Sequence, residues 1–475
     1  MTAGYKLRYN VGQVIGIDQL PDDVLLEIFH FYVNMLKYYD KSGIEEWQSL
    51  VHVCRRWRSI VFVSPRRLDL KLFCTPETPA EDTLDVWPAL PLIVEGYIDL
   101  FSSSIITALR QNNRVCQVDL DLAGWSSEVV LAAMQVPFPE LTDLQLWSYH
   151  QALPVIPDSF LGGSAPRLRS LTLNCIPFPG LPKLLLSATH LVRLRLHRIP
   201  HSAYISPQAI VSLLAALSSL ETLHLGFESP QSRPDWESPS LPPRKRSILS
   251  DLTNFHFNGV TEYLEELMIR IDTPQLAIME IAFFNQIDFH CPQLAQFINC
   301  TPILRALDEA HVQFDDHVAR VNLRSRTSDL LINVSCREPD WQLSSIEQVC
   351  NWSLPPLSAV EVLFIDHRYI NLVWKTEAIE DTLWLELLLP FTAVKNLYLS
   401  NEFAPAIAAA LQELVGGRTE ILPSLQNIFV EGLKLSGSFQ ENIRQFVAAR
   451  QLSDHLIAIS DWNKDSNPGL NIESE

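Results

Sequence analysis

The sequence predicts an α+β fold with a repeat: a small all-helical module at the N-terminus, then a long, irregular α/β array. Three observations lead to this prediction. The chain has 475 residues, which is too many for one ordinary hydrophobic core. Large apolar residues crowd two short stretches, 17–33 and 47–62. Beyond them, the pattern apolar-x-x-apolar-x-apolar recurs almost to the end of the chain.

The first apolar stretch, IDQLPDDVLLEIFHFYV, has the features of a helix with a wide apolar surface. Pro21 suits the first helical turn, where its missing N–H costs nothing. Asp22 and Asp23 then favour the positive end of the helix dipole. The second stretch, WQSLVHVCRRWRSIVF, repeats this density of apolar residues. Two short helices cannot hide so much apolar surface by themselves. We therefore expect either the next domain of the chain or a partner protein to cover one side.

The ordered elements LPDDVLLEIF, LVHVCRRWRSIVF and PRRLDLKL resemble the F-box, and the likeness runs from Ile17 to about Leu72. One departure is the connection HFYVNMLKYYDKSGIEE, which is longer than usual. The resemblance implies a small helical module that binds a Skp-family adaptor and, through it, a cullin–RING ubiquitin ligase. It also implies an adaptor-binding face formed by Leu20, Pro21, Val24, Leu25, Ile28, Phe29, Val53, Cys54 and Trp57.

The repeated hexamers predict one short strand each. Ten of them begin at residues 115, 141, 168, 191, 220, 252, 276, 360, 394 and 425. Successive starts among the first five lie 26, 27, 23 and 29 residues apart, which matches the leucine-rich-repeat period of about 20–29 residues. Each repeat is expected to give one strand, and neighbours are expected to stack into an irregular leucine-rich-repeat solenoid. The register is unclear between 290 and 355, where we expect a helix over 291–307 and strands over 311–323 and 329–336.

These patterns predict the order of domains. We expect an N-terminal tail over 1–14, the F-box domain over 15–75, and a connection with a first cap or repeat over 76–114. The solenoid then spans 115–435, and a C-terminal cap helix and an acidic tail span 436–475. Five prolines between 230 and 243 predict an exposed loop over 229–247 within the solenoid.

The strand residues that lie between inward apolar positions predict a target-binding face, because side chains alternate along a strand. They are Asp119, Gln145, Thr172, Arg195, His224 and His256, with Trp147, Arg193 and His197 beside them. On an acidic chain, Arg193, Arg195, His197 and Arg198 form a local basic patch. We hypothesise that it meets an acidic or phosphorylated segment of a target. The alternative is a solvated strand face paired with neighbouring carboxylates.

Composition excludes several classes of function. The net charge of −19 argues against nucleic acid as the main partner. We expect no membrane association and no signal segment. Eight cysteines without a CxxC motif predict reduced, buried thiols and a cytoplasmic or nuclear location. No GxSxG, P-loop, HExxH or paired Cys/His metal spacing is present, so we expect no catalytic residue, metal or cofactor.

Taken with the resemblance, these features predict a non-catalytic, substrate-recognition subunit of an SCF-type E3 ubiquitin ligase, in which the repeat array binds the target. The layout, including DTLDVWPALPLIV and FTAVKNLYL, resembles the expanded F-box families of mushroom-forming fungi. The alternative is a leucine-rich-repeat scaffold or sensor not linked to ubiquitin. In that case the F-box-like helices would cap the solenoid and cover its first strand.

Overall fold

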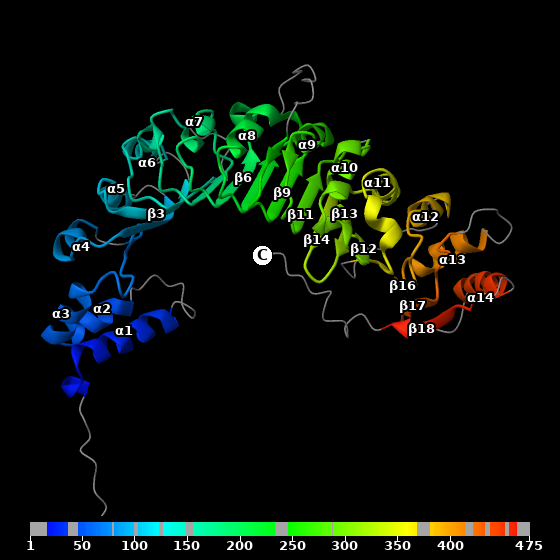
Figure 1. The fold of residues 1–475 in the computed structure, drawn as a ribbon, viewed down its shortest axis with the longest axis horizontal. Helices are drawn as coiled ribbons and strands as arrows, with labels where there is room; N and C mark the ends of the chain where they lie inside the picture. The colour runs from blue at the N-terminus through cyan, green and yellow to red at the C-terminus, as the bar shows by residue number, and fades with distance from the viewer. Residues whose placement is uncertain are drawn as a thin grey trace, which may run out of the picture. The chain divides into compact units, whose positions relative to one another are not determined.

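The computed structural model describes residues 17–36, 46–77, 80–98, 103–122, 127–148, 155–232, 246–286, 288–367, 381–413, 421–432, 438–451 and 456–462. The chain divides into two compact units, Met1–Leu141 and Thr142–Glu475, and Figure 1 shows their elements. The predicted tail 1–14, most of the predicted loop 229–247 and the acidic tail after 462 lie outside the described residues.

The first unit begins with helices and continues with a small parallel sheet. Its helices are α1 (Asp22–Leu36), α2 (Glu46–Val53), α3 (Arg55–Val63), α4 (Ala80–Val86), α5 (Ser103–Leu109) and α6 (Ser127–Ala133). Its strands are β1 (Leu72–Cys74), β2 (Leu92–Ile98) and β3 (Val115–Leu122), and β2 pairs in parallel with both neighbours.

Local chemistry explains where the first helices begin. Asp22 and Asp23 occupy the first turn of α1, as the sequence predicts. Cys54 separates α2 from α3 with an extended backbone, and its sulfur accepts the N–H of Trp57 as the N-cap of α3. The two helices therefore form a tight corner around one residue.

An aromatic cluster, Trp47, His52, Phe62 and Trp87, connects these helices to the segment that follows them. The ring of Trp47 lies 5.3 Å from that of Trp87 and 6.1 Å from that of Phe62, in edge-to-face arrangements. The Trp47 indole N–H also donates to the carbonyl oxygen of Lys71. Aromatic pairs of this geometry add about 0.5–1.5 kcal/mol each beyond area burial. The cluster thus joins the helical region and the start of the sheet within one core.

The second unit is built on a large, mostly parallel sheet. Its strand order is β4-β5-β6-β7-β9-β11-β14-β13-β12-β15-β16-β17-β18. The bounds are β4 (Asp143–Trp147), β5 (Ser170–Asn174), β6 (Arg193–Ile199), β7 (Thr222–Phe227), β9 (Asn254–Gly259), β11 (Ile278–Phe283), β12 (Glu309–Phe314), β13 (Val318–Arg324), β14 (Asp329–Ser335), β15 (Val362–His367), β16 (Asn396–Leu399), β17 (Asn427–Glu431) and β18 (Ala458–Trp462). A separate two-stranded sheet pairs β8 (Ser247–Ile248) with β10 (Ile271–Asp272).

Helices follow most of these strands and lie along one side of the large sheet (Figure 1). They are α7 (Leu181–Leu185), α8 (Pro207–Leu214), α9 (Thr261–Met268), α10 (Pro292–Cys300), α11 (Pro339–Trp352), α12 (Asp381–Leu388), α13 (Ala404–Glu413) and α14 (Ser438–Gln451). The hydrophobic core lies between the two layers. In β7, for example, Leu223 and Leu225 are buried while Thr222 and His224 are only partly covered. The other face of the sheet carries no helix among the described residues, and we call it the open face.

All ten hexamers lie on strands, and those strands pair in parallel wherever two of them are neighbours within a unit. The predicted strands are therefore present, and their parallel pairing is a finding of the structure. The strands do not by themselves establish a leucine-rich-repeat solenoid, and that assignment stays a prediction. Two of the eight cysteines, Cys54 and Cys300, are exposed rather than buried as expected.

The region 290–355, where the sequence register is unclear, contains the main irregularity of the sheet. The helix and strands expected there form as α10, β12, β13 and β14. Strand β13 runs antiparallel to both β12 and β14, which the sequence analysis did not predict. Near the C-terminus, β18 pairs in parallel with β17 after the expected helix α14.

Candidate functional site

Helix α1 has a buried apolar stripe that holds it in the first unit. Leu25, Phe29 and Val33 are no more than 7% exposed. The Phe29 ring packs 4.7 Å from the half-buried ring of Trp57 on α3. Leu25 and Phe29 belong to the predicted adaptor-binding set. In this structure their side chains lie in the core of the first unit.

A second apolar stripe on α1 faces solvent. Val24, Ile28, Phe31 and Tyr32 are 40%, 41%, 68% and 40% exposed, and Pro21 beside them is also exposed. Residues three, four and seven apart share one face of a helix. These five residues therefore form one continuous surface, the α1 stripe. The predicted set omitted Phe31, although its position three residues after Ile28 places it on the same face.

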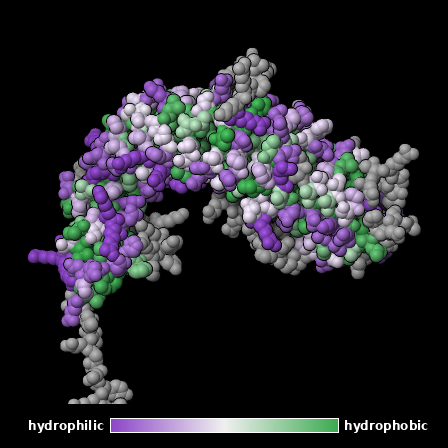
Figure 2. Space-filling view, in the orientation of Figure 1, coloured by the Kyte–Doolittle hydropathy of each residue, from purple (hydrophilic) through white to green (hydrophobic). Residues whose placement is uncertain are grey.

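The remaining predicted adaptor residues lie at the α2–α3 corner and at the start of α1. Val53 is 59% exposed and Cys54 is exposed, whereas Leu20 and Trp57 are half-buried. The surface view shows hydrophobic residues reaching solvent in this helical part of the first unit (Figure 2). A monomer has no structural use for so much exposed apolar surface on one helix.

Polar contacts fix the start of α1 against α3 and the residues that follow α3. The Arg56 guanidinium on α3 donates to the Asp22 carboxylate at 2.5 Å and to the carbonyl oxygen of Leu20 at 2.6 Å. Arg67 pairs with Glu27 in the same way. These contacts involve exposed side chains, so they orient the helix more than they stabilise it.

The predicted target-binding residues of the second unit form one row across the open face. Strand pairing places them side by side in the order Gln145, Thr172, Arg195, His224, His256 and Glu280. Arg193 and Arg195 are exposed, and Thr172 is buried. Asp119 lies on β3 in the first unit and is described with that unit.

The imidazoles in and beside this row contact one another. The ring of Trp147 stacks on His197 at 6.0 Å, His197 lies 3.9 Å from His224, and His224 stacks on His256 at 5.6 Å. A nitrogen of His256 lies 2.9 Å from a carboxylate oxygen of Glu280. The sequence placed these residues on one face, and the structure adds that they form a contiguous aromatic and imidazole group.

Burial and neighbouring charges control protonation within this group. Burial lowers the pKa of His224 to about 3, and His197, His256 and Arg195 act in the same direction. Burial also lowers the pKa of His197, with a contribution from Arg195. The hydrogen bond with His256 lowers the pKa of Glu280. At neutral pH, His197 and His224 are therefore neutral and Glu280 is ionised.

The same row continues past β11 with different chemistry. Beyond Glu280 it passes through Leu331, Asn322, His311, Phe364, Tyr398 and Phe429. The last four rings stack at centroid distances of 4.3, 4.4 and 4.4 Å. The sequence did carry a signal for this aromatic ladder, because Phe364, Tyr398 and Phe429 lie between the inward apolar positions of the last three hexamers. Only His311, on β12, lies outside the hexamers.

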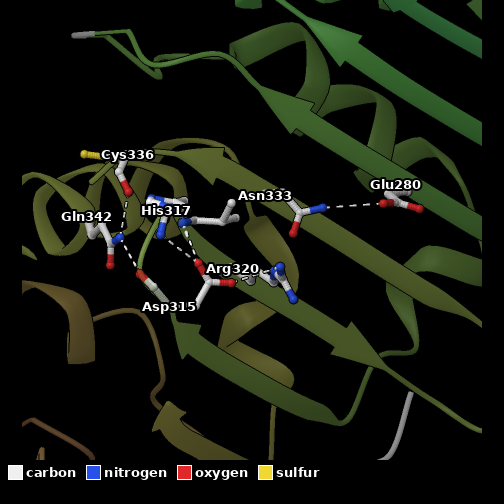
Figure 3. Close-up of polar contacts among 8 residues, drawn as sticks. Glu280, Asp315, His317, Arg320, Asn333, Cys336 and Gln342 are labelled. Carbon is white, nitrogen blue, oxygen red and sulfur yellow. Dashed lines mark hydrogen bonds and ion pairs between the residues drawn. The ribbon is translucent and has the colours of Figure 1, made fainter. Parts of the chain in front are cut away.

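Figure 3 shows the polar contacts at the junction between the two parts of the row. The side-chain amide of Asn333 donates to Glu280 at 3.5 Å. Asp315, in the turn between β12 and β13, accepts the backbone N–H groups of His317 and Val318 and pairs with Arg320 at 3.1 Å. The segment FDDHVAR, within the expected strand region 311–323, thus contains an ordered hairpin turn.

Cys291 and His290 are adjacent in the sequence and could suggest a Cys/His catalytic pair, but they do not form a reactive site. Burial, with the nearby Glu265 carboxylate, raises the pKa of the Cys291 thiol to about 12, so the nucleophilic thiolate is not available near neutral pH. The His290 ring packs against Trp352. Among the described residues, no group of three or more His, Cys, Asp or Glu side chains is arranged to hold a metal ion. Within the same residues, no helix combines the length and apolar character needed to cross a membrane.

Comparison with known proteins agrees with the geometry of the first helices. The family model described as F-box-like matches residues 17–69, a range that contains α1, α2 and α3 with the whole α1 stripe. A search of curated proteins finds no match to the chain. Residues 17–69 are thus an F-box-like domain, and such domains are typically recognition modules that bind Skp1-like adaptors rather than catalysts.

Proposed function

We propose that this chain is the substrate-recognition subunit of an SCF-type E3 ubiquitin ligase, composed of a Skp adaptor, a cullin and the F-box protein. The observation that carries the proposal is the α1 stripe, an exposed apolar surface inside the F-box-like match. In this proposal the adaptor covers the stripe together with Val53 and Cys54. Leu20, Leu25, Phe29 and Trp57 support these contacts from beneath.

The second unit would hold the target on its open face. We propose that residues 115–435 form an irregular leucine-rich-repeat solenoid, which the ten hexamers on strands and the helices along one side of the large sheet support. Its row of polar and aromatic side chains offers a continuous surface for a protein segment. The layout also supports a place among the expanded fungal F-box families, and we propose a cytoplasmic or nuclear location for the assembly.

The mechanism in this proposal is positioning. The chain supplies no ubiquitin-transfer chemistry of its own, because a conjugating enzyme bound elsewhere in the ligase modifies lysines of the target. Holding target and conjugating enzyme in one assembly raises their effective concentration and makes the transfer step intramolecular. Rigid secondary structure in both units suits this role.

The alternative is an interaction scaffold in which the F-box-like helices only cap the solenoid. A cap would hide the apolar surface of α1 within the chain. Val24, Ile28 and Phe31 remain 40%, 41% and 68% exposed in the folded chain, which favours the receptor.

The test is binding of the purified chain to a Skp-family adaptor by calorimetry. We expect Val24→Asp or Ile28→Asp to weaken binding at least about thirtyfold, because an unpaired charge buried at an interface costs about 2 kcal/mol or more. Val129→Asp on α6 is the matched control, since Val129 is also exposed, at 52%, and lies in the same unit. Binding that survives both stripe substitutions, in variants with wild-type circular dichroism, would reject the receptor proposal.

A further inference from the structure

The basic end of the open face contains an exposed cation, Arg195, for which the described residues provide no counter-ion. Arg193 pairs with Asp143 at 3.4 Å, and Glu280 is engaged by His256. Arg195 lies between these two pairs in the row, is exposed, and has no ion pair with any described carboxylate. The chain has a net charge of −19. An exposed guanidinium without a described counter-ion on a sheet face is therefore unusual for this chain.

The neighbours of Arg195 offer hydrogen-bond donors without further positive charge. His197 and His224 make ring contacts but no hydrogen bond to a described residue. Each neutral imidazole still carries one N–H donor. At neutral pH the row between Thr172 and His256 therefore carries the positive charge of Arg195, and the exposed Arg198 lies beside the row in the bulge of β6.

The backbone beside these side chains is irregular. The register of β6 against β7 shifts between Leu196 and Ile199, and Arg198 within this bulge has the left-handed φ of 48°. On β7, Gly226 is buried, and a Cβ there would lie only 3.2 Å from Nε2 of His224. The His224 ring therefore packs closely over this glycine, and a larger residue at 226 would displace it.

We infer that the open face around Arg195 binds an extended segment of the target protein through an Asp or Glu side chain, with Arg195 as the partner of the carboxylate. His197 and His224 donate to the same group, and the Trp147–His197 stack supports a neighbouring residue. This inference rests on the proposed function, since it names what the receptor recognises.

Charge balance selects a carboxylate over a phosphate. A carboxylate carries one negative charge, which Arg195 neutralises. A phosphoserine carries between one and a half and two negative charges at neutral pH. The excess would have to be met by Arg198, which lies outside the row, or by protonation of His197 or His224, which their burial opposes.

The test uses three pools of acetylated and amidated decapeptides with Glu, Gln or phosphoserine fixed at the central position and the other positions degenerate. The full chain is immobilised, and captured peptides are quantified by mass spectrometry. We expect at least tenfold enrichment of the Glu pool over the Gln pool. Arg195→Glu should abolish this enrichment, and the matched control Arg305→Glu, an exposed arginine on the short helix Ile303–Arg305, should leave it unchanged.

Several results would overturn the inference. They are equal capture of the Glu and Gln pools, enrichment that survives Arg195→Glu, and phosphoserine capture that exceeds Glu capture. Adaptor binding, measured on the same immobilised samples, distinguishes failure of the carboxylate site from failure of the proposed receptor function. If the wild-type chain binds the adaptor but does not enrich the Glu pool, only the carboxylate site is rejected. If the wild-type chain does not bind the adaptor, the receptor function is rejected as well.

Discussion

At the residue scale, His224 has the environment that responds most strongly to acid. It lies in contact with the rings of His197 and His256, and Arg195 is its neighbour on β6. Burial is the main reason that its pKa falls from 6.5 to about 3. The unfolded chain therefore binds a proton at this residue in a pH range where the folded chain does not.

This difference predicts a pH dependence of stability. A histidine whose pKa is lowered by folding stabilises the folded state above the unfolded pKa of about 6.5, and that contribution is lost as pH falls toward about 3. We expect the free energy of unfolding to fall with acidification by up to about 1.4 kcal/mol more per pH unit in the wild-type chain than in His224→Gln. Urea unfolding followed by circular dichroism between about pH 7 and pH 5 measures it. The exposed His190→Gln is the control, and parallel curves for wild type and His224→Gln would contradict the prediction.

At the element scale, local pattern predicted the strands and tertiary packing decided the rest. Hexamers such as LETLHL specify a strand by their alternation, and β7 forms there. The pattern in α1 predicted a wide apolar surface. It could not show that Leu25 and Phe29 are covered while Ile28 and Phe31 are open, because that choice depends on how α2 and α3 pack. The direction of β13 is likewise a long-range property that no local pattern records.

The antiparallel hairpin β12–β13 depends on one buried amide. Gln342 on α11 is 1% exposed, and its side-chain nitrogen donates to the carbonyl oxygens of Asp315 and Cys336 at 2.8 and 2.7 Å (Figure 3). We expect Gln342→Leu to lower the free energy of unfolding by about 2–4 kcal/mol, because each buried carbonyl left unpaired costs about 1–3 kcal/mol.

Urea unfolding of the full chain measures this effect. The exposed Gln208→Leu on α8 is the matched control, and it should stay within about 0.5 kcal/mol of wild type. If the two leucine variants unfold at the same urea concentration, the amide contacts do not stabilise the hairpin.

At the scale of the whole molecule, the two proposed interactions belong to separate compact units. The α1 stripe lies in Met1–Leu141, and Arg195 lies in Thr142–Glu475. Substitutions in separate cores without shared partners act independently. The adaptor site and the target site should therefore be removable one at a time.

A double-mutant experiment tests this independence. Val24→Asp should lose adaptor binding and keep Glu-pool capture, Arg195→Glu should do the reverse, and the double variant should lose both. Calorimetry with the adaptor and peptide capture are run on all four proteins. A loss of peptide capture in Val24→Asp that exceeds about twofold would show coupling between the units, contrary to this expectation.

The aromatic cluster of the first unit also bears on how the F-box-like domain could be exchanged between proteins. The match ends at residue 69, but Trp47 uses the carbonyl oxygen of Lys71 and the ring of Trp87, both beyond that end. A chimaera that transplants residues 17–69 alone would strip Trp47 of these contacts and present its ring to water. The segment that folds correctly after transplantation is therefore longer than the family match. A functional chimaera should include the chain at least through the end of β2.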